Sequence, residues 1–322
     1  MKTKLKQFRV AAHMTQAKVA EAVGVTQPNY HRWESGSAPI PDEKLKKLAK
    51  ALKTTPETIL GRHPPVKAAF YDNEAPENLQ YYGEVAIHFL EGGTPLLLSI
   101  SEEAHSRLYR DLQGDAKFVI VQSLGNQTVA IRTKAISDLY FSSEAYDDFG
   151  PEHETYEDGT PLHLPDPRDW EIIESLATDE VGIEDFNPAD VERVRKSVMI
   201  TDEQYKELVA DGLIKPENLE AERAKNNGLT NRIFEQATNT IYQLSCGQRR
   251  SVMVDGPKII YEAFWELIDF DGDTDDGMIR LPAEGYHRTI FINKDALDYV
   301  SIPTHQFEEG SIDTAAEEID AT

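Results

Sequence analysis

The sequence predicts a small all-α head of five helices followed by an α+β body, in which two similar ββαβββ units are separated by a helical insert. Three observations lead to this fold class. Apolar residues recur at helical spacing up to about residue 64, whereas alternating, β-branched runs begin near Tyr81. The net charge changes sign between these two regions. The same order of strands and helix appears twice, before and after a helical stretch.

Charge is divided unevenly along the 322 residues, whose formal net charge is −24. Residues 1–64 hold 12 Lys+Arg and 5 Asp+Glu, a net charge of +7, and the remainder holds 21 basic and 52 acidic residues, a net charge of −31. A basic head suits nucleic acid. The acidic body should be repelled by DNA, which would confine contact to the head.

The cysteine content and the hydropathy point to a cytoplasmic protein. Cys246 is the one cysteine of the sequence, so an intramolecular disulfide is excluded and a reducing compartment fits. No apolar run reaches transmembrane length, and the Lys-rich start lacks the apolar segment of a signal peptide. We therefore expect a soluble, intracellular chain, with two to three domains at this length.

A short helix is predicted to begin after Thr15 and to end at Gly24. The Thr15 side chain can cap the first turn, and Gly24 supplies the positive φ that terminates the helix. Its inward face consists of Val19, Ala20 and Val23.

A second short helix should follow directly. Thr26 is placed to cap it, and Pro28 stands in its first turn, where a missing N–H costs nothing. Tyr30 and Trp33, at i and i+3, point to the core. The polar residues that remain outside are Gln27, Asn29, His31 and Arg32. Two short helices joined by a glycine turn, the second with a polar outer face, make a helix-turn-helix.

These residues also carry a family resemblance. The run Met-Thr-Gln-Ala-Lys-Val-Ala-Glu…Gly-Val-Thr-Gln-Pro-Asn-Tyr-His-Arg-Trp-Glu-Ser-Gly resembles the DNA-binding domain of Cro/C1-type repressors, the XRE family, over about residues 3–62. The resemblance implies a partner, double-stranded DNA, bound by paired copies of the domain. It also implies an ion pair between Arg9 and Glu34 that ties the first helix to the end of the recognition helix. Arg9 would then be structural despite its charge.

The outer face of the second helix is expected to read bases. Gln27 and Asn29 can pair bidentately with adenine, and Arg32 with guanine. Pro28 departs from the family's usual polar residue and offers only apolar contact, such as to a thymine methyl, and His31 completes this face. Contacts to phosphates are expected where helix N-termini and flanking loops meet the DNA backbone, from Thr15, Gln16, Lys18 and Ser37.

The rest of the head should contain three further helices. They are predicted at Lys4–Ala12, at Asp42–Lys53 with leucines at helical spacing, and at 55–60. His63-Pro64-Pro65 ends the domain, so its bounds are 1–64, and residues 65–79 form a linker.

The first α+β unit is assigned to residues 80–150. Its strands are predicted at Glu84–Leu90, Pro95–Ile100, Lys117–Ser123, Thr128–Thr133 and Asp138–Ser142, with a helix at 101–112. At an offset of 155 residues the start of this unit falls on Asn239–Leu267, and at 161 its end falls on the segment up to Ile302. Phe118 and Ile120 would then meet Ile279 and Leu281. The second unit is therefore placed at 237–307.

The body is not assigned to a family. Val129–Phe141 is similar to the closing strands of Sm-like small barrels, as is Ile290–Ile302, and ordinary strand–turn–strand texture explains the fit almost as well. Residues 151–236, between the units, predict an acidic helical insert, with an N-cap at Asn187 and capping-box spacing after Thr201. The acidic, apolar-poor tail at 308–322 is expected to be disordered.

No metal site, cofactor or catalytic group is expected. The acidic run that begins at Asp269 fails as a calcium loop because, counted from Asp271, position 6 lacks glycine and position 12 is Pro282. His153-Glu154 lacks the second histidine of a zinc motif. Gly92-Gly93 is a turn without the pattern of a phosphate loop.

The resulting hypothesis is a sequence-specific, dimeric transcription regulator of bacterial or phage type, most simply a repressor at the nucleoid, and not an enzyme. Its body would set the oligomeric state or sense a signal. Two alternatives remain open. An antitoxin-like protein or interaction module would use the acidic body to neutralise a basic partner. An enzyme with a fused DNA-binding head would need a deep pocket with convergent ionisable groups, which the sequence does not offer.

Overall fold

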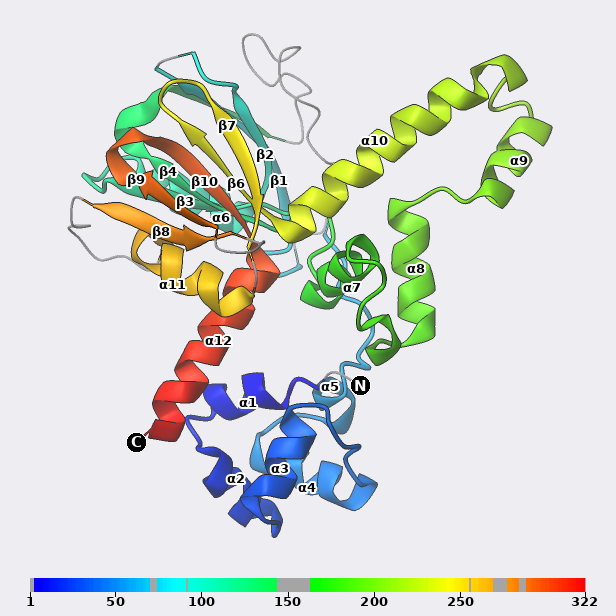
Figure 1. The fold of residues 1–322 in the computed structure, drawn as a ribbon, viewed down its shortest axis with the longest axis vertical. Coiled ribbons are helices and arrows are strands. Elements are labelled where there is room, and N and C mark those ends of the chain that lie inside the picture. Colours follow the sequence, from blue (N-terminus) through cyan, green and yellow to red (C-terminus); the bar gives the residue numbers. More distant parts are fainter. Residues whose placement is uncertain are drawn as a thin grey trace.

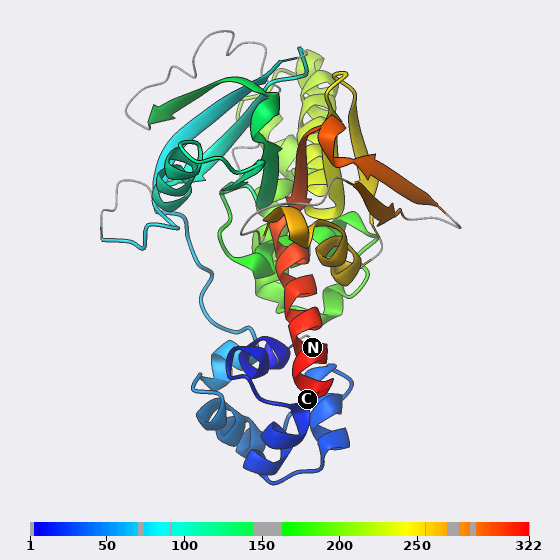
Figure 2. The ribbon, with the colours of Figure 1, turned by 90° about the vertical axis from the view of Figure 1, so that its left-hand side faces the viewer.

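The computed structural model describes residues 3–69, 74–90, 92–143, 163–254, 256–268, 277–283 and 288–321. The helical head lies at one end of an elongated molecule and the strand-rich body at the other (Figure 1). Helix α12 (Thr304–Ala321) runs from the body down to the head. It lies against α1 (Leu5–Ala11), so helices from opposite ends of the chain are neighbours in space (Figure 2).

Within the described residues the head consists of α1, α2 (Gln16–Val23), α3 (Gln27–Glu34), α4 (Asp42–Ala51) and α5 (Pro56–Ile59). It encloses its own apolar core, because each helix contributes a fully or almost fully buried side chain. These include Leu5, Val19, Tyr30, Leu48 and Ile59. The helical head predicted from the sequence is therefore confirmed.

The body contains these strands in its described part: β1 (Tyr81–Phe89), β2 (Leu96–Ser101), β3 (Phe118–Gln122), β4 (Gln127–Arg132), β5 (Ile136–Ser143), β6 (Asn239–Leu244), β7 (Arg249–Met253), β8 (Met278–Pro282), β9 (Thr289–Asn293) and β10 (Leu297–Pro303). They form antiparallel sheets in the orders β2-β1-β5, β3-β4-β10-β6-β7 and β8-β9. Because β10 pairs with both β4 and β6, the two halves of the body share one sheet.

Two helices cover apolar cores of the body. α6 (Glu102–Asp111) is capped by Ser101, whose hydroxyl accepts the N–H of Ala104 at 3.2 Å, and the helix buries its Leu108 in the first core. α11 (Pro257–Ile268) buries Phe264 in the second core. Single 3-10 turns, η1 (Thr133–Ala135) and η5 (Lys294–Ala296), lead into β5 and β10. An α+β body with several sheets is thus confirmed.

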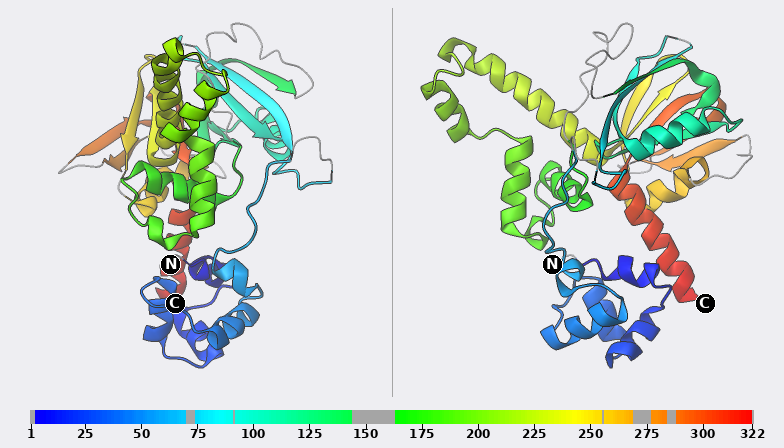
Figure 3. Two further views of the ribbon diagram at one scale, coloured as in Figure 1. Left: turned by 90° about the vertical axis from the view of Figure 1, so that its right-hand side faces the viewer. Right: turned by 180° about the vertical axis from the view of Figure 1, so that it is seen from behind.

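Between the two halves lies a helical insert, of which residues 151–162 fall outside the described part. It contains α7 (Pro167–Ala177), η3 (Ile183–Asp185), α8 (Pro188–Val198), α9 (Asp202–Ala210), η4 (Pro216–Asn218) and α10 (Leu219–Thr238). Thr201 and Gln204 form a reciprocal capping box at the start of α9. α10 projects away from the sheets and carries α9 at its far end (Figure 3).

The C-terminal tail differs from its prediction: residues 308–321 are helical, not disordered. The acidic, apolar-poor composition led to the wrong prediction, because contacts with other helices stabilise this segment although it has few apolar residues of its own. Phe307, Gly310 and Ala316 are buried, and α12 packs along α11 and α1. At the start of the helix His305 is buried, and its Nε2 lies 3.0 Å from a carboxylate oxygen of Glu174 on α7.

Candidate nucleic-acid interface

The turn between α2 and α3 is built by local backbone chemistry. The Thr15 hydroxyl accepts the N–H of Lys18 at 3.1 Å and so caps α2. Gly24 ends the helix in the left-handed region, at φ 67°, and its N–H returns to carbonyls of the last turn. Val19 and Val23 are buried between these two ends, which fixes the helix on the core.

The start of α3 differs from its prediction in one respect. Thr26 stands at the N-cap position with an extended backbone, but its side chain caps no N–H. Pro28 is the second residue of the helix and has no N–H to offer. The N–H of Asn29 donates to the Thr26 carbonyl at 3.0 Å instead, so the backbone closes the first turn by itself.

α3 separates an apolar from a polar face as predicted. Tyr30 is fully buried and Trp33 is nearly so, and burial raises the pKa of the Tyr30 phenol, which therefore stays neutral. The exposed face consists of Gln27, Pro28, Asn29, His31 and Arg32. Two aromatic anchors thus hold a short helix with its polar side outward.

Gln16 joins the start of α2 to this exposed face. Its side-chain carbonyl accepts a hydrogen bond from Gln27 at 3.0 Å, and its amide nitrogen lies 3.4 Å from Nδ1 of His31. The residues predicted to contact phosphates and those predicted to contact bases therefore meet on one surface. Lys18 is exposed on α2, and Ser37 is exposed in the loop after α3, with its hydroxyl 2.8 Å from that of Ser35.

The ion pair between Arg9 and Glu34 lies inside the head. The Arg9 guanidinium donates to the carboxylate at 2.9 and 3.1 Å, and both side chains are almost completely buried. Arg9 also donates to the carbonyl of Met14 at 3.1 Å. One side chain thus connects α1, the segment before α2 and the end of α3.

Sequence reasoning missed the partner that α12 brings to this site. The backbone N–H of Gln16 donates to the Asp320 carboxylate at 2.9 Å, and the Arg9 guanidinium lies 3.2 Å from the same group. A second acid of α12, Asp313, pairs with Lys6 at 2.6 Å. These residues are about 300 positions apart in the sequence, and no local pattern signals such a contact.

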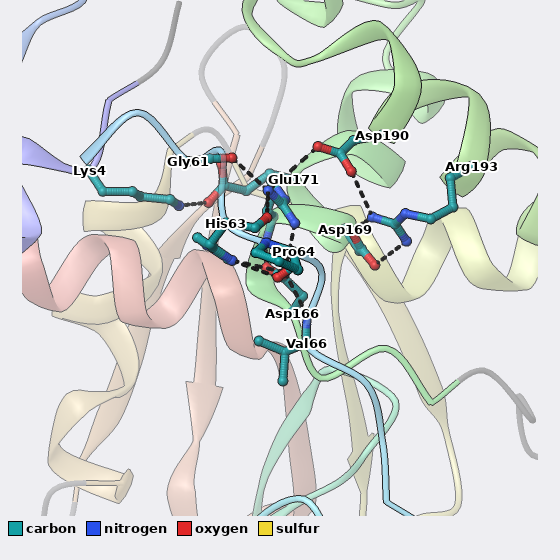
Figure 4. A network of polar contacts seen from close by, with 11 residues as sticks. Lys4, Gly61, His63, Pro64, Val66, Asp166, Asp169, Glu171, Asp190 and Arg193 are labelled. Atoms are coloured by element: carbon teal, nitrogen blue, oxygen red, sulfur yellow. Dashed lines mark hydrogen bonds and ion pairs between the residues drawn. The ribbon is translucent and has the colours of Figure 1, made fainter. Parts of the chain in front are cut away.

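A buried polar network also fixes the end of the head to the insert (Figure 4). Arg168 of α7 donates to the carbonyls of Gly61 and His63 at 2.6 and 3.0 Å, and pairs with Asp166 at 3.0 Å. Lys4 pairs with Glu171 beside it. The head is therefore held by charged groups of the body on two sides.

The same network continues outward through α8. Arg193 forms hydrogen bonds with Asp169, at 2.5 and 2.8 Å, and with Asp190, at 3.4 Å. The hydrogen bonds to Asp169 raise the pKa of the Arg193 guanidinium, so this cation is permanent. α7 and α8 are thereby locked together behind the surface that receives the head.

The candidate metal-binding segments of the sequence fall outside the part of the chain that the structure describes. These are the acidic run at 269–276 and the segment around His153. Elsewhere in the described ranges, no group of three or more potential metal-ligating side chains comes together. Gly92 adopts φ 72°, and its N–H donates to the Phe89 carbonyl at 3.2 Å, which closes the turn expected from the sequence.

Comparison with known proteins identifies the head alone. Residues 5–59 match the family model described as helix-turn-helix, so this segment is a helix-turn-helix domain of XRE type. Neither the curated proteins nor the solved structures contain a match to the chain. The α+β body thus has no family assignment. Among the described helices, none combines the length and the apolar character that a membrane span requires.

Proposed function

We propose that the chain is a sequence-specific DNA-binding transcription regulator, acting as a dimer and most simply as a repressor. One observation carries the proposal. The exposed polar face of α3 is anchored from behind by buried Tyr30 and Trp33, and lies on the basic end of an otherwise acidic protein. A short helix of this kind fits the major groove. We assign the protein no catalytic activity.

Base reading is assigned to the exposed face of α3. Arg32 would donate bidentately to guanine, and Gln27 and Asn29 would pair with adenine. Pro28 would offer an apolar surface, and His31 a further donor or acceptor. None of these side chains is needed for the core, since all of them are exposed.

Phosphate binding is assigned to the rim of the same surface. The N-terminus of α2 presents backbone N–H groups at Thr15 and Gln16, where an anion is favoured. Lys18 and Ser37 lie exposed beside it. Such contacts position the protein on DNA without selecting sequence.

The body is proposed to set the oligomeric state and to consist of two copies of one ββαβββ unit. Strand pairing supports the proposed repeat. In the first half β1 pairs with β2 and β5, and β3 with β4, and in the second half β6 pairs with β7 and β10, and β8 with β9. His88↔Asp138 is followed by Phe89↔Ile136, and Gln243↔Tyr299 by Leu244↔Leu297, so the ladder irregularity recurs at the corresponding position.

The test is selection of bound duplexes from random DNA by the full-length chain. Enrichment of one sequence with two half-sites is expected. Arg32→Ala and Gln27→Ala should each relax the preference at one base position, at a cost of roughly 1–3 kcal/mol of discrimination. Lys18→Ala, the matched control on α2, should weaken binding about equally for all sequences. If Arg32→Ala left the selected sequence unchanged, Arg32 would not read bases.

A second candidate function rests on the net charge of −31 beyond residue 64. An acidic body suits an antitoxin-like protein that neutralises a basic partner while its head binds DNA. A basic protein that co-purifies with the chain and dissociates at high salt would favour this function.

A further inference from the structure

The junction between the two halves of the body shows how one half can bind another. β4, the fourth strand of the first half, pairs antiparallel with β10, the fifth strand of the second, from Tyr299↔Ile131 to Pro303↔Gln127. The corresponding strands are β9 and β5. In the described part of the chain β9 pairs with β8 alone and β5 with β1 alone. Each therefore presents one unpaired edge.

Exposure distinguishes the open edges from the closed junction. Ala130 of β4 is fully buried, whereas its counterpart on β9, Phe291, is 63 % exposed. Ser301 of β10 is 4 % exposed, and its counterpart on β5, Tyr140, is 40 % exposed. Two large side chains, Phe291 and Tyr140, are thus exposed to solvent on the open edges, whereas their counterparts at the junction between the halves are buried. An open edge bearing apolar side chains is a template for another strand.

We propose that β9 of one chain pairs with β5 of a second copy of this chain, repeating the junction between β4 and β10. The counterparts lie 161 residues apart, since η1 begins at Thr133 and η5 at Lys294. Transferring the observed register gives Leu139↔Phe291 and Tyr140↔Ile290 as intermolecular pairs. The contact joins two different edges of the chain, so it closes a dimer when it forms twice, with β9 of each chain against β5 of the other.

Mass measurement of the full-length chain by sedimentation is the first test. The wild type should self-associate, and Phe291→Lys should raise the dissociation constant by roughly tenfold or more, because a charged side chain would lie beside Leu139 of the partner strand. Leu213→Lys is the matched control, since Leu213 is 74 % exposed and lies between α9 and η4 of the helical insert, outside the sheets. A wild type that stays monomeric, or an assembly that Phe291→Lys leaves intact, would overturn the proposal.

Cross-linking tests the register itself. In a Cys246→Ser background, chains with Leu139→Cys are mixed with chains carrying Phe291→Cys, and a disulfide-linked dimer is expected in the mixture. Asp138→Cys replaces Leu139→Cys as control, because adjacent strand residues point to opposite faces. Equal cross-linking by the two would show a different contact and overturn the register.

A second inference rests on the proposed function and on an independent observation. We infer that Asp320 occupies the place of a DNA phosphate. Its carboxylate accepts the Gln16 N–H at 2.9 Å, at the start of α2, and lies 3.2 Å from Arg9. An anion at that position excludes a second one, so the end of α12 must leave before the backbone N–H can meet DNA.

The test compares DNA affinity of the full-length protein before and after Asp320→Asn. Affinity for all sequences should rise by about two- to fivefold, the effect of one charge near a helix N-terminus. Glu317→Gln is the matched control, because this residue of α12 pairs with Lys258 of the body. An equal rise in both variants, or none in Asp320→Asn, would overturn the inference alone. Absence of DNA binding by every protein would overturn the proposed function as well.

Discussion

Arg9 has a different role from that of a surface cation in a basic head. Its guanidinium is about 1 % exposed and is shared by Glu34, the Met14 carbonyl and Asp320. Removing one partner of a buried ion pair leaves the other charged and desolvated. The resemblance to the XRE family pointed to the pair with Glu34 from sequence, whereas the link to Asp320 depends on the tertiary path of α12.

Arg9→Ala should lower the stability of the head by about 3–5 kcal/mol, because the Glu34 carboxylate would remain buried without its partner. Unfolding by urea, followed through the tryptophan of the head, measures this. Arg32→Ala is the control, and its exposed side chain should change stability by no more than about 0.5 kcal/mol. Equal stability of Arg9→Ala and wild type would mean that the pair contributes nothing to the fold.

Glu84 of β1 makes stability depend on pH. Burial raises the pKa of this carboxyl above 4.5 and outweighs the opposing effect of hydrogen bonds from Ser99 and Tyr81. The folded state therefore binds the proton more tightly than the unfolded state. Stability associated with the protonated group is fully present below pH 4.5 and is lost as the pH rises through the raised pKa.

Glu84→Gln should accordingly be more stable than wild type at neutral pH, and the difference should shrink as the pH falls through the raised pKa of Glu84 towards 4.5. Melting temperatures measured across this range give the result. Glu103→Gln, at an exposed position of α6, should show no such trend. A larger difference in acid than at neutral pH would have the wrong sign and would contradict the assignment.

Among the elements, α12 depends on one glycine. A Cβ at Gly310 would lie 2.2 Å from the Pro257 carbonyl oxygen and 2.8 Å from Cβ of Tyr261. These are a backbone atom and the first atom of a side chain, so neither can swing away. The close approach of α11 and α12 therefore requires the absence of a side chain.

Gly310→Ala should destabilise the packing of α12 by about 1–3 kcal/mol through overpacking, despite the better helix propensity of alanine. Hydrogen exchange along α12 reports this directly. Gly228→Ala, in α10, is the control because a Cβ there meets nothing within 4 Å, and this change should stabilise by up to about 1 kcal/mol. Slower exchange in Gly310→Ala would show that the crossing tolerates a methyl group.

Elements with a local signature were predictable, and those that depend on distant contacts were not. Caps at Thr15 and Thr201 and the buried faces of α2 and α3 follow from sequence spacing. Within the proposed repeat, strand pairing displaces the expected match of Phe118 and Ile120 with Ile279 and Leu281 by one residue. Phe118 opposes Arg132 and Met278 opposes Asn293, which makes Val119 the counterpart of Ile279. A shift of one residue moves every side chain of a strand to the opposite face of the sheet. In a strand such as β3, where almost every residue is apolar, the sequence does not reveal such a shift.

For the candidate site, sequence placed α3 and its exposed face, because helix periodicity determines which residues are buried. It gave no sign that α12 would contact the start of α2 or that Arg168 would bind the backbone at Gly61. Both contacts join residues more than 100 positions apart. The predicted disorder of the tail failed for the same reason, since composition describes a segment only in isolation.

At the scale of the whole molecule, the head and the body carry net charges of opposite sign. The head, with its own apolar core and a net charge of +7, is attached to a body of net charge −31. Acidic α12 lies against α1, so part of the positive charge of the head is already paired with the body. The electrostatic attraction between DNA and the head is therefore weaker in the full chain than in the head alone.

On a short duplex that holds one half-site, residues 1–64 should consequently bind more tightly than the full-length chain at low salt. Each should lose affinity as salt rises, because phosphate contacts release counterions. The difference in affinity between residues 1–64 and the full-length chain should become smaller as salt rises. Salt screens the long-range repulsion between the acidic body and DNA, whereas the base contacts are the same in both proteins. Affinity titrations at several salt concentrations measure both effects, and residues 74–322 serve as the control that should not bind. If the full-length chain bound this half-site more tightly than residues 1–64 at low salt, the body would attract DNA. The acidic charge of the body could then not be what confines DNA contact to α2 and α3.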